Sequence, residues 1–113
     1  MTIEKIVIDY LKNKLNIPAY AEKPENAPDE YLIVERVGGS ISNFIRMSEI
    51  SVRCISTTMY NASVLNDKVI SAMLDIDDCN PISHCSLEED SNYTDTTTKR
   101  YRNRSIFKVV YTE

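Results

Sequence analysis

The sequence predicts a single α+β domain over residues 1–113, with two helices packed on one face of a mostly antiparallel sheet in the order α-β-β-β-α-β-β. Two segments, 3–15 and 59–74, carry apolar residues at helical spacing, and each has only one apolar face. The other apolar segments alternate with a period of two or are rich in β-branched residues. Because an amphipathic helix buries its apolar face against another layer, both helices are expected on the same side of one sheet.

The bulk composition is that of a globular chain, with 42% hydrophobic and 27% charged residues. A net charge of −4 and a pI near 5.0 argue against a protein that coats nucleic acid, which normally needs a basic surface. Three cysteines without paired spacing indicate a reducing compartment and no disulfide framework. The N-terminus has neither a signal-peptide pattern nor a run of transmembrane length, so we expect a cytoplasmic protein with no membrane partner.

The N-terminal third predicts a helix, a short strand and a connector. The helix is expected over Ile3–Leu15, with Thr2 as its N-cap and Asn16 ending it. A short strand is expected over Pro18–Glu22. The following stretch, Glu22–Glu30, is acidic and contains two prolines, which predicts a solvated connector.

The centre of the chain predicts two long strands. Tyr31–Val37 is rich in β-branched and aromatic residues, and the next strand begins at Met47 with clear alternation. Between them stand the only glycines of the sequence, Gly38 and Gly39, which permit positive φ and so predict a turn or a bulge. Ser40–Arg46 has apolar residues without a clean period, and its structure stays open at this point.

The second helix is expected over Met59–Leu74, capped by Thr57 or Thr58. Its acidic C-terminal neighbours would oppose the helix dipole, so they are expected mostly beyond the last turn. Ile82–Leu87 predicts a short strand. The polar stretch Glu88–Lys99 predicts a loop or the exposed turn of a hairpin.

The final strand is expected over Tyr101–Thr112, with apolar residues on both of its faces, which suggests cover by a neighbouring subunit. A basic run marks its start and comprises Lys99, Arg100, Tyr101, Arg102 and Arg104. Because rim charges of opposite sign fix register between subunits, this run is predicted to meet an acidic edge of a neighbour. The candidate interface residues are Arg100, Arg102, Arg104, Glu88, Glu89 and Asp90.

Candidate chemistry is sparse. Cys79, His84 and Cys85 lie within seven residues and could give three zinc ligands, but the second ligand pair typical of zinc sites is missing. The same residues lack an orienting partner for Cys–His catalysis, and Cys54 fits the core of its strand. No phosphate-binding loop, dinucleotide fingerprint or nucleophile elbow occurs. We therefore predict no catalytic residue, no metal site and no cofactor.

The order of several segments carries a family resemblance. After the N-terminal helix and the acidic connector come YLIVERVGG, then EISVRCISTTMYNASVLNDKVISAM, then KRYRNRSIFKVVYTE after a polar turn. This pattern, over nearly the whole chain, resembles the tail terminator (tail completion) proteins of long-tailed bacteriophages. Small head–tail joining and minor capsid proteins are similar at this level.

The resemblance implies a non-enzymatic structural protein of a phage or prophage. Such proteins form a ring, usually of six copies, on the head-proximal end of the tail tube; the ring stops tube growth and offers a face to the head–tail connector. The expected partners are therefore other copies of the chain, the tail tube and connector proteins, with assembly in the bacterial cytoplasm and a final place in the virion tail or neck. DNA would pass through the lumen without specific binding, which suits a chain of net charge −4.

Three hypotheses follow in this order. The first is the ring-forming structural protein, whose assembly loop would contain Gly38, Gly39, Phe44 and Arg46 and could order only on assembly. The second is a small nucleic-acid-binding module that uses the Lys99–Arg104 run, with Tyr101 stacking on bases. The third is an enzyme or metal protein built on His84 and its neighbouring cysteines.

Overall fold

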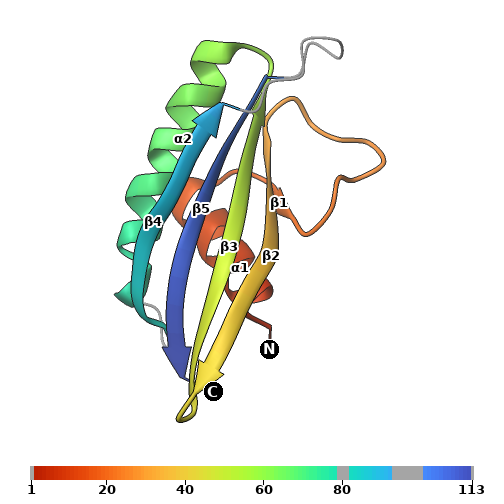
Figure 1. Cartoon of the computed structure of the whole chain (residues 1–113). Helices are drawn as coiled ribbons and strands as arrows, with labels where there is room; N and C mark the ends of the chain where they lie inside the picture. Colours follow the sequence, from red (N-terminus) through yellow and green to blue (C-terminus); the bar gives the residue numbers. More distant parts are fainter. Residues whose placement is uncertain (1, 79–81, 93–100, 113) are drawn as a thin grey trace.

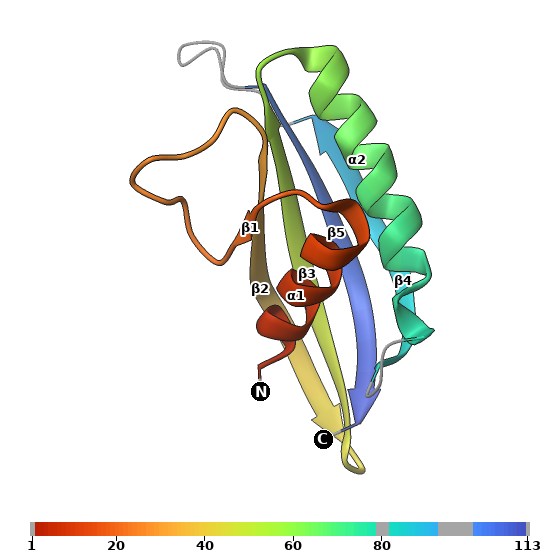
Figure 2. The same cartoon turned by 180° about the vertical axis from the view of Figure 1, so that it is seen from behind.

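The computed structural model describes residues 2–78, 82–92 and 101–112. They form two layers, a five-stranded sheet in the order β1-β2-β3-β5-β4 and two helices that both lie on one of its faces (Figures 1 and 2). All neighbouring strands are antiparallel except β1 and β2. The predicted α+β class and the predicted element order are both confirmed.

Helix α1 (Ile3–Leu15) has the predicted bounds. Thr2 Oγ1 accepts a hydrogen bond from the backbone N–H of Lys5 at 3.3 Å, which satisfies one of the unpaired donors of the first turn. Asn16 ends the helix in the left-handed conformation, with φ 56°. Tyr10 also donates its hydroxyl to the carbonyl of Ala72 at 2.7 Å, and this bond fixes α1 against the second helix.

Strand β1 (Ala19–Tyr20) is shorter than the predicted Pro18–Glu22 and pairs in parallel with β2. The connector that follows is not wholly solvated, because Ala27 packs against a small cluster on the sheet face opposite the helices. Tyr31, Ile33 and Ile55 form that cluster, with Tyr20 against it. The connector thus covers one edge of a face that is otherwise open; we call this face the open face.

Strands β2 (Tyr31–Ser42) and β3 (Ile45–Ser56) form a hairpin that is longer than expected. Gly38 and Gly39 do not make the turn; they lie inside β2, where the register shifts by one residue after Arg36, and neither has a positive φ. The bulge, one of the two predicted alternatives, is therefore present, and the glycine turn is wrong. A Cβ on Gly39 would lie 2.6 Å from the carbonyl oxygen of Met47, so close approach of the two strands explains a glycine here.

The turn itself lies at Asn43 and Phe44, inside the stretch whose structure the sequence left open. Both residues have positive φ, 51° and 68°. Two successive positive φ values at the centre of a two-residue hairpin loop are the signature of a type I′ turn, whose twist matches that of the strands. Asparagine tolerates this conformation, but phenylalanine rarely adopts it. The tip of the hairpin is consequently a strained position with an aromatic side chain.

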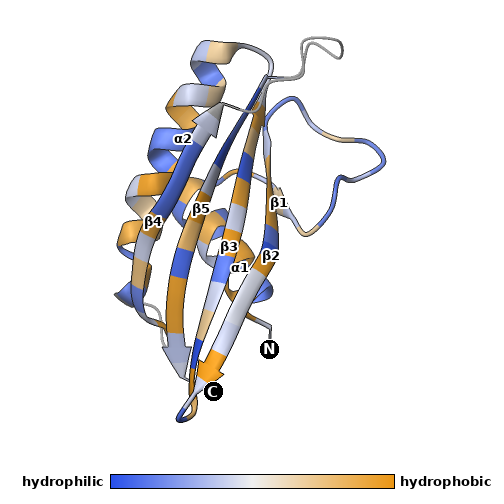
Figure 3. Cartoon of the chain, in the orientation of Figure 1, coloured by the Kyte–Doolittle hydropathy of each residue, from blue (hydrophilic) through white to orange (hydrophobic). Residues whose placement is uncertain are grey.

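Helix α2 (Met59–Leu74) also has its predicted bounds, and Thr58 is the N-cap, accepting from Asn61 N at 3.0 Å. Asp75 caps its C-terminus and a short 3₁₀ turn, η1 (Ile76–Asp78), follows, so the acidic cluster lies beyond the last turn as expected. The apolar faces of α1 and α2 bury against one core with the helix-side residues of the sheet. Figure 3 shows the resulting alternation of apolar and polar residues along the strands.

Strand β4 (Ile82–Asn92) corrects the predicted bounds of the fourth strand, which continues five residues past Leu87. It pairs with β5 (Tyr101–Thr112), whose bounds are as predicted. The acidic residues Glu88–Asp90 therefore belong to a strand and not to a loop. Sequence polarity misled the prediction because this edge strand faces solvent on one side, while its cross-strand bonds to β5 come from the backbone and need no apolar residues.

Candidate functional site

The tip of the β2–β3 hairpin carries exposed apolar side chains, among them the most exposed large apolar residue of the described part, Phe44. Phe44 is 85% exposed, and Ile41 and Ile45 beside it are 58% and 49% exposed. The tip projects from one end of a molecule that measures 45 × 24 × 23 Å, beyond the helical layer (Figure 2). Exposed apolar clusters of this kind are typical of surfaces that contact another protein.

A polar network holds the base of this tip where the helices no longer cover the sheet. Arg36 donates from Nε to Ser48 Oγ at 3.2 Å, and Ser48 Oγ and Tyr111 Oη share a hydrogen bond of 2.9 Å. The guanidinium of Arg46 lies over the Tyr111 ring, 5.6 Å from its centroid. These contacts come from β2, β3 and β5 and make the tip a supported projection. Of the four predicted assembly-loop residues, Phe44 and Arg46 lie at this tip, whereas Gly38 and Gly39 lie further down the hairpin.

The predicted basic surface is balanced by acids of the same chain. On the open face, Arg53 Nη2 lies 3.4 Å from Glu35 Oε2, and Arg104 Nη2 lies 3.6 Å from Glu89 Oε1. Arg53 and Arg104 are direct cross-strand partners of β3 and β5, so the four residues form a charged row across four strands. Lys108 has Glu49 opposite it in register. Of the basic run Lys99–Arg104 on which the nucleic-acid hypothesis rests, Arg104 is thus paired with an acid of its own chain, and Lys99 and Arg100 lie outside the described residues.

Some of the predicted interface residues pair with each other within one chain. Arg104 and Glu89 pair inside one chain, and Arg102 stands two residues earlier on the same face of β5. Glu88 is exposed on β4. Arg100 lies outside the described residues. The role of these residues between subunits remains a prediction.

Asp90 has a role that the sequence did not suggest. Its Oδ1 accepts a 2.7 Å hydrogen bond from Nδ2 of Asn66, a residue of α2 that is only 4% exposed. Asn66 Oδ1 accepts from Ser105 Oγ at 2.6 Å and from Cys54 Sγ at 3.7 Å. The acid thus ties β4 to α2. An asparagine on the apolar face of a predicted helix was the available clue, because a buried polar side chain needs partners.

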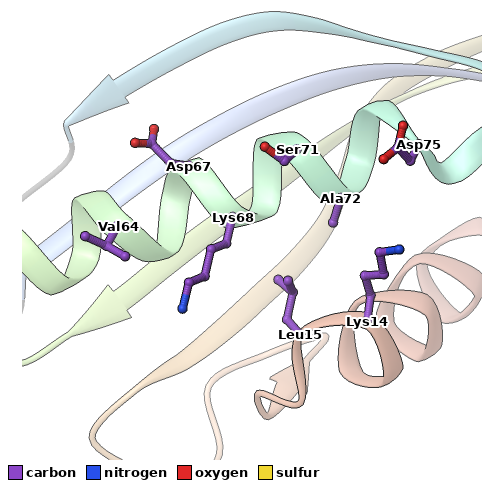
Figure 4. Close-up of a pocket in the computed structure, with 8 residues that line it drawn as sticks. All are labelled: Lys14, Leu15, Val64, Asp67, Lys68, Ser71, Ala72 and Asp75. Carbon is purple, nitrogen blue, oxygen red and sulfur yellow. The ribbon is translucent and has the colours of Figure 1, made fainter.

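A hollow of about 440 Å³ lies between the C-terminal end of α1 and the outer side of α2 (Figure 4). In Figure 4 the side chains of Leu15, Lys68 and Ala72 point into the gap between the two helices. The lining residues are Lys14, Leu15, Val64, Asp67, Lys68, Ser71, Ala72 and Asp75. The hollow has an apolar floor and a rim with both signs of charge. The sequence pattern gave no sign of this hollow, because its walls come from two helices that are distant along the chain, α1 (Ile3–Leu15) and α2 (Met59–Leu74).

The cysteine–histidine group does not form a site among the described residues. His84 is exposed and pairs with Val110, whereas Cys85 is buried on the helix side of the same strand. Burial raises the pKa of the Cys85 thiol to about 12, with Asp77 adding to the effect. Burial likewise raises the pKa of Cys54, and Asp90 and Glu30 contribute. Cys79 lies outside the described residues. Within residues 2–78, 82–92 and 101–112, no group of three or more His, Cys, Asp or Glu side chains is placed to hold a metal ion.

Within the described segments, no helix has the length and apolar content needed to cross a bilayer.

Of three comparisons with known proteins, the one against solved structures gives a match. No family model matches the sequence, and no curated protein matches it either. Among solved structures, a chain described as part of the "Virion of native gene transfer agent (GTA) particle" superposes with a TM-score of 0.71 at 9% sequence identity. The match covers 98% of this chain and 95% of that one. At this identity the likeness establishes a shared fold along both chains.

Proposed function

We propose that this chain is a non-enzymatic structural protein of a phage or prophage particle, which forms a ring at the head-proximal end of the tail, ends tube growth and provides the face for head joining. The observation that carries the proposal is the end-to-end fold match to a virion chain. The resemblance of the segment order to tail terminators supports the same proposal, and it rests on the sequence pattern alone, without the fold match.

The described surface supports an assembly role. A ring needs two different patches that meet head to tail. The exposed apolar hairpin tip and the charged open face are two such surfaces, and they lie on different parts of the molecule. In the proposed virion, the partners are other copies of this chain, the tail tube and connector proteins. DNA crosses the lumen without specific binding, and particles assemble in the bacterial cytoplasm.

The test is the oligomeric state of the purified protein. Light scattering or native mass spectrometry should give a multiple of the 12.9 kDa protomer mass, six being the expected number, and negative-stain images should show rings. A strict monomer at all concentrations would contradict the proposal. Turnover of a substrate would contradict the non-enzymatic role.

The charged face has its own test. Replacing both Arg102 and Arg104 by glutamate should weaken ring formation and leave the protomer folded. The Arg104–Glu89 pair is partly exposed to solvent, so the loss of its attraction should cost the protomer no more than about 1 kcal/mol. Normal assembly of the double variant at moderate salt would remove these residues from the interface.

A further inference from the structure

We infer that the hairpin tip of one copy inserts into the hollow between α1 and α2 of the next copy, with Phe44 as the inserted side chain. The inference rests on the proposed ring and names the two surfaces that meet in it. The tip and the hollow belong to different elements and lie at different places on the molecule, so their contact is of the head-to-tail kind that can close a ring.

The shapes and polarities of the two surfaces fit. Phe44 stands at the apex of the turn, where its 85% exposed ring has no cover in the protomer. The hollow, of about 440 Å³, has room for one aromatic ring and presents Leu15 and Ala72 on its floor. An aromatic anchor in an apolar pocket with a polar rim is the usual centre of a protein–protein contact.

Charge selects this hollow over the alternative on the same molecule. A second hollow, of about 380 Å³, lies on the open face beside the hairpin and includes Lys108, with no carboxylate among its lining residues. Arg46, two residues past Phe44, would meet a like charge there. The hollow between the helices instead carries two carboxylates, Asp67 and Asp75, which balance its two lysines, Lys14 and Lys68. Asp75 stands at the C-terminal end of α2, where the helix dipole is also negative.

The two residues of the charged pair lie at similar short distances from the inserted ring and from its contact. Two residues along a strand span roughly 6.6 Å. Three residues along a helix, from Ala72 to Asp75, advance roughly 4.5 Å along its axis. A tip that places Phe44 on Ala72 therefore brings Arg46 near the Asp75 carboxylate, and the guanidinium would leave its place over the Tyr111 ring to pair with it. The backbone strain at Phe44, with φ 68°, holds the ring at the apex where insertion needs it.

Disulfide cross-linking between two proteins that each carry one introduced, exposed cysteine tests the contact directly. Both proteins carry Cys79→Ser, and their remaining native thiols, Cys54 and Cys85, are buried. One protein carries Asn43→Cys, beside the intact Phe44 at the tip, and the other carries Lys68→Cys. We expect a cross-linked dimer after mild oxidation of the mixture, and none from either protein alone. A matched control replaces Lys68→Cys by Ser40→Cys, at the rival hollow, and should stay uncross-linked.

A second measurement uses Phe44→Ala, which should weaken ring association at least about tenfold per contact, the usual effect of removing a buried aromatic anchor. If the wild-type protein forms rings but Phe44→Ala forms them equally well and the mixture does not cross-link, this inference is wrong and the ring proposal stands. Cross-linking to the Ser40→Cys protein instead would show that the tip contacts the open face, and this result would also overturn the inference. If the wild-type protein forms no oligomer, the ring proposal fails and the inference fails with it.

Discussion

Asn66 offers the sharpest test of how this fold is held together. Replacing it by alanine removes three hydrogen bonds at once, to Ser105, Asp90 and Cys54. Ser105 is fully buried, so its hydroxyl loses its partner where water cannot replace it, at a cost of about 1–3 kcal/mol. Asp90 is exposed and can rehydrate, which limits its share to about 1 kcal/mol. We expect Asn66→Ala to lower the free energy of unfolding by about 2–4 kcal/mol.

Urea unfolding followed by circular dichroism measures this change. Asp67→Ala is the matched control, because Asp67 is the next residue of α2 and is exposed; it should change stability by about 0.5 kcal/mol or less. A loss below about 1 kcal/mol for Asn66→Ala would refute the reasoning. It would mean that the buried network contributes little and that apolar contacts alone hold β4 to α2.

The chemistry of the pair can be tested separately. Asn66→Asp places a second carboxylate beside Asp90, at the position where the donor now stands 2.7 Å away, and should destabilise more than alanine at neutral pH. The swap Asn66→Asp with Asp90→Asn restores one amide and one carboxylate and should recover most of the loss. If the swapped protein is no more stable than Asn66→Asp alone, the hydrogen bond between these residues is not what the substitution disrupts.

Three further predictions concern the hairpin and the buried thiols. Phe44→Gly should raise protomer stability by about 0.5–1 kcal/mol in thermal unfolding, since glycine relieves the positive φ of 68°, while ring formation is lost; a destabilised protomer would contradict the assigned turn. Gly39→Ala should cost about 1–3 kcal/mol, because its Cβ would lie 2.6 Å from a backbone oxygen, whereas Gly38→Ala, whose Cβ meets only a side chain at 3.5 Å, should change little; equal effects would count against the close approach. Cys85 has its pKa raised from 9.0 to about 12, so the unfolded chain releases this proton first and stability should fall by up to about 1.4 kcal/mol per pH unit between pH 9 and 12. Cys85→Ala should show a shallower fall over that range, and an identical pH profile would show that the thiol does not contribute.

Local pattern was enough where an element is decided by its own residues. The bounds of both helices follow from apolar spacing and caps, since Thr2, Asn16 and Thr58 satisfy the end groups of their own helices. The final strand likewise follows from its alternation. The class of fold then follows because each helix has one apolar face to bury.

The sequence indicated the exposed hairpin tip only in part. Phe44 and Arg46 were named as candidates, but the glycines beside them suggested the wrong turn. Glycine permits a positive φ without requiring it, and here close contact between strands is what excludes a side chain. Which pair of residues turns the hairpin depends on the register of β2 against β3, and that register is set by pairing along the whole hairpin.

By itself, then, the sequence determined the two helices, the final strand and the α+β class of this protein, because spacing and capping are properties of neighbouring residues. Only the tertiary structure decided which partners the charged side chains have. It paired Arg104 with Glu89, bound Asp90 to Asn66 and opened a hollow between α1 and α2. These contacts join residues that are distant along the chain, and strand order brings them together.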